Sequence, residues 1–155
     1  MKSFKKIILG LLIVFVLIQF IQPARNVNEK IQSTDITKVI NVPENIQAVL
    51  RTSCNDCHSN HTNYPWYSRV QPFGWLLAKH IMNGKAELNF NEFGSYSLRR
   101  QSSKLKGIEN SIKDGTMPLG SYTLLHRNAK LSQEDKIVII DWLERTRDSI
   151  SSKDQ

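Results

Sequence analysis

Cys54-Asn55-Asp56-Cys57-His58 is the stretch of sequence around which the expected fold is organised. Two cysteines three positions apart, followed directly by a histidine, form the attachment signal for c-type haem. In that chemistry the two thiols add across the haem vinyl groups as thioethers, and the adjacent imidazole becomes the proximal ligand of the iron. The chain contains 2 cysteines in all. The sequence therefore predicts one covalently bound haem c, held by Cys54, Cys57 and His58.

Different kinds of site could use the same side chains. Cys54, Cys57, His58 and His61 together offer four nitrogen and sulfur ligands, as a tetrahedral zinc site requires. Structural zinc sites usually pair two separated groups of ligands, whereas these four residues are nearly consecutive. The two cysteines could instead be a redox dithiol, but no βαβ pattern surrounds them as in a thioredoxin-like protein. A structural disulfide and two unrelated thiols are the remaining possibilities.

Length and charge limit the range of functions. A chain of 155 residues is long enough for one domain with one core. The formal net charge is +7, from 21 basic and 14 acidic residues. Three of the basic residues, Lys2, Lys5 and Lys6, belong to the N-terminal segment. The rest of the chain therefore has 18 basic and 14 acidic residues, a net charge of +4. The sequence has no basic helix with interleaved aromatic residues, so we expect no nucleic-acid partner.

Residues 1–21 follow the pattern of an uncleaved signal anchor. Residues 1–6 include three lysines and no acidic residue, and residues 7–21 are apolar except for Gly10 and Gln19. Fifteen helical residues rise only ~22 Å, so the flanking lysines would have to snorkel to the headgroups to complete a hydrocarbon core of ~30 Å. The small residues of a signal-peptidase site are missing from the end of the apolar run. We therefore expect an N-terminal transmembrane helix that is not cleaved.

The position of the lysines predicts the orientation of the chain. Because they precede the apolar run, the N-terminus should stay in the cytoplasm and the remainder should be exported. The expected location is the bacterial inner membrane, with a single span and the C-terminal domain in the periplasm, where haem c is attached. Residues 22–42 are polar and are predicted to be a linker.

Four helices are predicted after the linker, in a domain spanning residues 43–148. The first begins at Pro43 and leads directly to Cys54, and the second begins at Pro72. The third is expected over about residues 97–113. Ser132 is a good N-cap for the fourth, which has acidic residues in its first turn. Residues 149–155 are expected to be a flexible tail.

Met117 is the candidate for the second axial ligand of the iron. It follows the helix stop at Asp114-Gly115 and precedes Pro118, so it should lie in an irregular but stiff loop. A thioether is a neutral, soft ligand that raises the haem reduction potential relative to a second imidazole. His126 is the main competitor for this position, followed by His61, His80 and Met82.

Several runs of residues resemble the bacterial haem-binding domain family, whose members are small membrane-anchored proteins with one CxxCH motif. The likeness covers nearly the whole chain, and its main segments are the Cys54–His58 motif with Ser59-Asn60, Tyr64–Ser68, Leu88–Phe90, Met117–Leu119, Ser121–His126 and Ala129–Ser132. The resemblance implies c-type haem binding through Cys54, Cys57 and His58. The assignment of Met117 is supported by its similarity to the Met-Pro loop of cytochromes c in general.

The combined prediction is an all-α, cytochrome c-like domain of about four helices after an N-terminal transmembrane helix. Its expected function is one-electron transfer between redox partner proteins through a single haem c, without catalysis on a substrate. A haem enzyme or sensor whose iron is open on one side is the first alternative, and it requires that Met117 does not bind the iron. A zinc-binding structural module is the second.

Overall fold

The computed structural model describes residues 2–28, 30 and 32–153, and within these ranges the chain is helical without strands. The predicted all-α class is confirmed. The helices, in chain order, are α1 (Lys2–Ile18), α2 (Ile36–Val39), α3 (Glu44–Ser53), α4 (Asn55–His58), α5 (Phe73–Glu87), α6 (Leu98–Lys113), α7 (Gly120–Leu125) and α8 (Gln133–Ser151). Three 3-10 turns, η1 (Trp66–Arg69), η2 (Phe90–Ser95) and η3 (Arg127–Ala129), lie between them.

The four helices predicted after the linker correspond to α3, α5, α6 and α8. Prolines directly precede α3 and α5. The Ser97 hydroxyl accepts a hydrogen bond from the Arg100 amide at the start of α6. Ser132 begins α8 with a capping box, in which its hydroxyl and the Asp135 carboxylate each accept from the other residue's backbone amide at 3.0 Å. These local signals explain why the starts of the long helices could be predicted.

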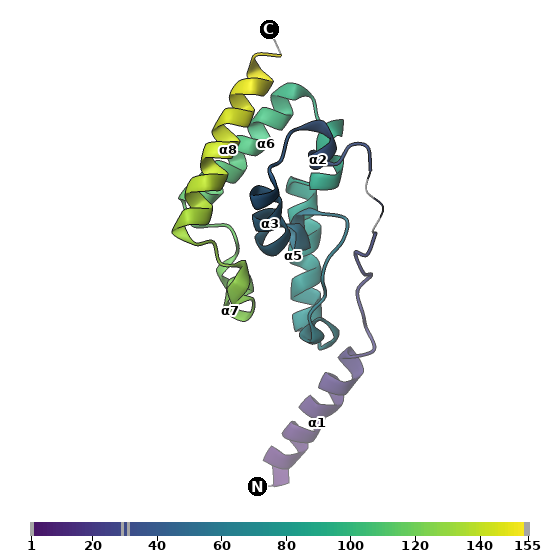
Figure 1. Ribbon diagram of the computed structural model, residues 1–155. Helices are drawn as coiled ribbons and strands as arrows, with labels where there is room; N and C mark the ends of the chain where they lie inside the picture. The colour runs from purple at the N-terminus through teal and green to yellow at the C-terminus, as the bar shows by residue number, and fades with distance from the viewer. Residues whose placement is uncertain (1, 29, 31, 154–155) are drawn as a thin grey trace.

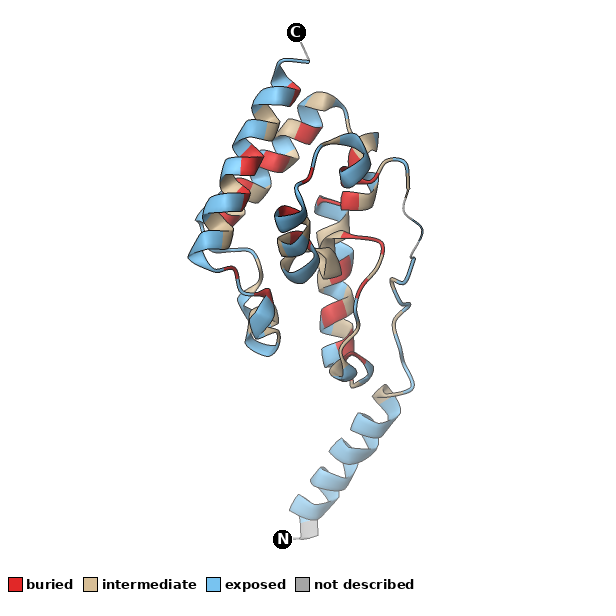
Figure 2. Ribbon diagram, viewed as in Figure 1, coloured by how far each residue is buried: buried red, intermediate tan, exposed pale blue. Residues whose placement is uncertain are grey.

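The core lies where α3, α6 and α8 meet. Helices α6 and α8 run side by side, and α3 contacts α8 (Figure 1). Figure 2 shows the buried positions gathered on the facing sides of these helices. The side chains that are fully enclosed there include Ile46, Leu105, Ile139 and Leu143. Phe93 of η2 is fully buried in the same core, so the segment between α5 and α6 is a structural part of the domain.

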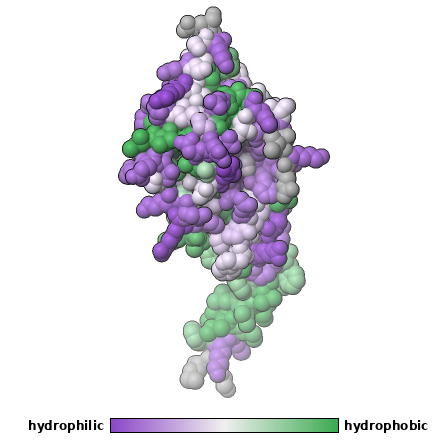
Figure 3. All heavy atoms as spheres, viewed as in Figure 1, coloured by the Kyte–Doolittle hydropathy of each residue, from purple (hydrophilic) through white to green (hydrophobic). Residues whose placement is uncertain are grey.

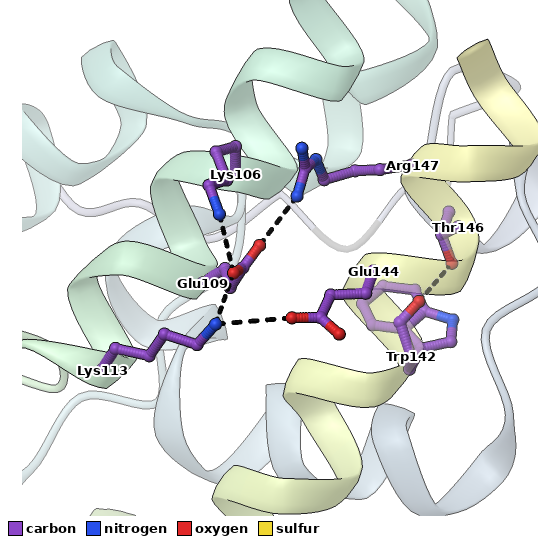
Figure 4. A network of polar contacts seen from close by, with 7 residues as sticks. All are labelled: Lys106, Glu109, Lys113, Trp142, Glu144, Thr146 and Arg147. Carbon is purple, nitrogen blue, oxygen red and sulfur yellow. Dashed lines mark hydrogen bonds and ion pairs between the residues drawn. The ribbon is translucent and has the colours of Figure 1, made fainter.

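A buried carboxylate joins α6 to α8. Glu109 accepts hydrogen bonds from Lys106 at 2.8 Å, from Lys113 at 2.6 Å and from Arg147 at 2.8 Å (Figure 4). Two of these cations lie on the same helix as Glu109, and Arg147 comes from α8. A charge in the interior is stable only when it is paired in this way.

The domain extends beyond the boundaries predicted at both ends. The expected linker over residues 22–42 includes α2, and Ile36 and Val42 are buried in the core. At the other end α8 continues to Ser151, because Ile150 also packs into the core. The flexible tail expected from residue 149 is therefore helical at its start, and its last two residues, 154–155, lie outside the described residues. A few apolar side chains in these polar segments therefore pack into the core and make both segments part of the domain.

Helix α1 stands apart from the core and exposes its apolar side chains (Figure 3). It ends at Ile18, where Gln19 donates from its side chain to the carbonyl of Phe15 at 2.9 Å. In the part of the chain that the structure describes, no helix reaches the length and apolarity needed to cross a membrane. The transmembrane helix predicted within residues 1–21 is thus not supported by the structure.

Candidate functional site

The Cys-x-x-Cys-His motif forms a single helical turn at the end of α3. The backbone amide of Cys54 donates to the carbonyl of Leu50 and thereby continues α3. The amides of Cys57 and His58 donate in turn to the carbonyl of Cys54, at 3.2 and 3.0 Å. Because the motif is helical, the first cysteine, the second cysteine and the histidine all border the same cavity.

Two cavities with common walls adjoin the motif, with volumes of about 280 and 300 Å³. Cys54, His58 and Met117 line both cavities, and Cys57 lines the first. The structure therefore brings Cys54, Cys57, His58 and Met117 to the walls of these two cavities. Each cavity alone is at the small end of the ~300–1,000 Å³ typical of ligand sites, and the two together fall well within that range. The walls of the second cavity include Leu88, Phe90, Ile108, Ile112, Pro118 and Leu131.

His58 is held in the form that a metal ligand needs. Its Nδ1 atom lies 3.0 Å from the carbonyl oxygen of Leu88. Since a carbonyl can only accept, Nδ1 carries the hydrogen, which leaves Nε2 unprotonated in the neutral ring. Burial lowers the pKa of His58, with smaller opposing effects from the carbonyls of Leu88 and Gly84. A backbone acceptor on the second ring nitrogen is the usual support of a metal-binding histidine.

Both cysteines are free and half-buried. Burial raises the pKa of Cys54 to about 12, with a further contribution from Cys57. The pKa of Cys57 rises to about 11, again through burial and then through the charge of Asp56. Reactive dithiols and zinc thiolates need surroundings that favour the thiolate. These thiols are in the opposite environment, which argues against a redox dithiol.

Met117 lies in the loop between α6 and α7. Gly115 turns the chain with φ of 67°, a value at which a glycine is favoured. The amides of Thr116 and Met117 then donate to the carbonyl of Ser111, at 3.0 and 3.2 Å. The side chain of Met117 is 38% exposed and borders both cavities, whereas Met82 lines neither of them.

The structure ranks the competing ligands differently from the sequence. His126 lines neither of the two cavities, and its Nε2 atom is 2.7 Å from the hydroxyl of Tyr67. His80, on α5, does line the first cavity. His61 lies outside both, and its amide donates to the hydroxyl of Ser59. Met117 is thus the axial candidate that shares both cavities with His58, and His80 replaces His126 as its competitor.

The zinc site finds no support in the geometry. Among residues 2–28, 30 and 32–153, no three histidine, cysteine, aspartate or glutamate side chains come close enough to hold a metal ion. Cys54, Cys57, His58 and His61 are close in sequence but do not converge on one point.

Two features of the site were not predicted. The first is the Leu88 carbonyl that orients His58, since backbone atoms leave no trace in the sequence. The second is Gly84 on α5: a Cβ atom there would lie 2.6 Å from the carbonyl oxygen of Cys57. Gly84 thus lets α5 approach α4 closely. An isolated glycine inside a helical pattern was the available signal for such an approach.

The comparison with protein families agrees with this site. A family model described as a haem-binding domain matches residues 13–145, which is most of the chain. The chain therefore belongs to the haem-binding domain family, and haem is the cofactor that this membership supports. Neither the comparison with curated proteins nor that with solved structures gives a significant match.

Proposed function

We propose, from the premise that the chain is a haem-binding domain protein, that it is a single-haem c-type cytochrome for one-electron transfer. Cys54 and Cys57 hold the haem covalently, His58 is the proximal ligand of the iron and Met117 is the distal ligand. The observation that carries the proposal is the meeting of these four side chains, 63 positions apart at the extremes, around two adjoining cavities.

The residues around the cavities suit a haem. The apolar walls of the second cavity would cover a flat apolar macrocycle and keep water from it. Neutral His58 offers Nε2, and the Leu88 carbonyl keeps the hydrogen on Nδ1. Bound haem supplies one iron that gains or loses a single electron, and the axial ligands and burial set its potential.

Membrane attachment is a further part of the proposal. The lysines in the first turns of α1 and the exposed apolar side chains that follow them support a membrane tether, with the haem domain on the periplasmic side of a bacterial inner membrane. Redox proteins at that surface would be its partners. Extraction of membranes with alkaline carbonate tests the tether. We expect the full chain to stay with the membrane and a chain that starts at residue 22 to be released.

Exchange of Met117 for alanine distinguishes electron transfer from an enzyme or sensor with an open iron. We expect the wild-type ferric protein to be low-spin and Met117→Ala to be high-spin, because in the variant one axial position of the iron is vacant or occupied by water. His80→Ala is the matched control and should stay low-spin. High-spin wild-type spectra that Met117→Ala does not change would favour the open-iron alternative.

A further inference from the structure

Helix α7 follows the Met117 loop directly, yet burial of apolar side chains does not hold it. None of its residues 120–125, all of which are described, is buried. Leu124 is 76% exposed and Leu125 is 60% exposed. In Figure 1 α7 lies at the edge of the domain, below the N-terminal end of α8. Because a short helix is only marginally stable by itself, contacts of a different kind must hold this one.

A row of polar and aromatic contacts attaches α7 to the haem-binding motif. The hydroxyl of Tyr122 donates to Oδ2 of Asp56 at 2.5 Å. The ring of Tyr122 stacks on His126, with centroids 4.2 Å apart and planes 8° from parallel. His126 in turn shares a hydrogen bond of 2.7 Å with the hydroxyl of Tyr67 on η1. This row joins α7 to α4 and η1, which both lie far from α7 in the sequence.

Asp56 is a fixed point for this attachment. It lies between the two cysteines of the motif, on α4. Its second carboxylate oxygen accepts from the backbone and side-chain nitrogens of Asn63, at 2.9 and 3.3 Å. Its carbonyl accepts from the hydroxyl of Thr62 at 2.6 Å. Asn63 and Thr62 thus fix the position of Asp56. A hydrogen bond to its charged carboxylate is stronger than a hydrogen bond between neutral groups.

We propose that Tyr122 is a positioning residue for Met117, an inference that rests on the proposed function. Met117 and Tyr122 border the same cavity and belong to one short segment. On the N-terminal side of Met117 this segment is tied to the Ser111 carbonyl, and on the C-terminal side it is tied by Tyr122 to Asp56. The hydrogen bond thereby links the segment that carries the distal ligand to the turn that carries the proximal one.

Imidazole binding to the ferric, haem-loaded full-length chain tests this inference, because imidazole competes with Met117 for the iron. Tyr122→Phe keeps the ring that stacks on His126 and removes the hydroxyl. We expect imidazole to bind about ten-fold more tightly to Tyr122→Phe than to wild type, from the loss of a hydrogen bond to a charged acceptor. Met117→Ala, with no ligand to displace, should bind imidazole most tightly.

Tyr64→Phe is the matched control. The Tyr64 hydroxyl accepts a hydrogen bond from the Asn26 amide at 2.8 Å and takes no part in the Tyr122–Asp56 hydrogen bond, so the imidazole affinity should stay at the wild-type value. The urea midpoint of Tyr122→Phe should fall by at most about 0.7 M, because a ten-fold effect corresponds to ~1.4 kcal/mol and the slope is ~2 kcal/mol per M. A merely structural role would lower that midpoint and leave the imidazole affinity unchanged.

Two results would overturn the inference, and they can be told apart. If Tyr122→Phe binds imidazole like wild type while Met117→Ala binds it more tightly, Met117 is the ligand but Tyr122 does not position it. If Met117→Ala also binds imidazole like wild type, Met117 is not the distal ligand, and the proposed electron-transfer site fails together with the inference.

Discussion

Replacement of Glu109 by glutamine should destabilise the domain by about 2 kcal/mol at neutral pH. Hydrogen bonds from Lys106 and Lys113 lower the pKa of Glu109 from its ordinary 4.5 to about 2. Each pH unit of that difference corresponds to ~1.4 kcal/mol, which gives an upper limit of about 3 kcal/mol. The side chain is 1% exposed, but its cationic partners are 28–47% exposed, so water screens part of the interaction.

The direction of the pH dependence follows from the lowered pKa. A carboxylate whose pKa is lower in the folded state stabilises the protein above pH 4.5, and this stabilisation is lost as the pH falls toward 2. Glu109→Gln lacks the titrating group. The gap in stability between wild type and the variant should therefore be full at pH 7 and should narrow progressively below pH 4.5.

Urea unfolding of the full chain, followed by circular dichroism, measures both effects. With a slope of ~2 kcal/mol per M, a loss of about 2 kcal/mol lowers the midpoint by about 1 M. Glu144→Gln is the matched control: Glu144 pairs only with Lys113 among these cations, at 3.4 Å, and is 52% exposed (Figure 4). Glu144→Gln should lower the free energy of unfolding by less than ~0.5 kcal/mol. Equal losses in the two variants, or a gap that does not change with pH, would refute the reasoning.

Two further substitutions test the positioning of the motif and the end of the fold. Gly84→Ala places a Cβ atom against the Cys57 carbonyl, so it should lower the free energy of unfolding in urea by about 1–2 kcal/mol and lower the yield of haem-bearing protein. Gly120 has open space around it, so the control Gly120→Ala should leave the free energy of unfolding unchanged. Ser132→Ala removes the capping box of α8 and should cost about 1 kcal/mol, and an unchanged urea midpoint would mean that the cap does not stabilise the helix.

The sequence predicted the parts of the fold that local signals determine. Prolines and serines at helix starts led to the four long helices, and the spacing of Cys54, Cys57 and His58 indicated one haem-binding turn. Met117 could be suggested because a helix stop and a proline surround it. All of these signals lie within a few residues of the feature that they predict.

The features that sequence reasoning missed depend on residues far apart in the chain. Leu88 orients His58 across 30 positions, and Tyr122 reaches Asp56 across 66. Residues 22–42 looked like a linker because their composition is mostly polar, although the apolar side chains of Ile36 and Val42 are buried. His126 was the main competitor of Met117 as iron ligand, since no pattern in the sequence shows that its ring already bonds to a tyrosine.

Covalent haem on the chain is the central claim, and one measurement tests it most directly. The full-length protein is produced with the haem c maturation machinery, separated on a denaturing gel stained for haem, and examined as its pyridine haemochrome. We predict a stained band at the mass of the chain and a c-type spectrum, both lost in the Cys54→Ser/Cys57→Ser double variant. A chain that loses its haem on the gel, or never acquires it, would contradict the account.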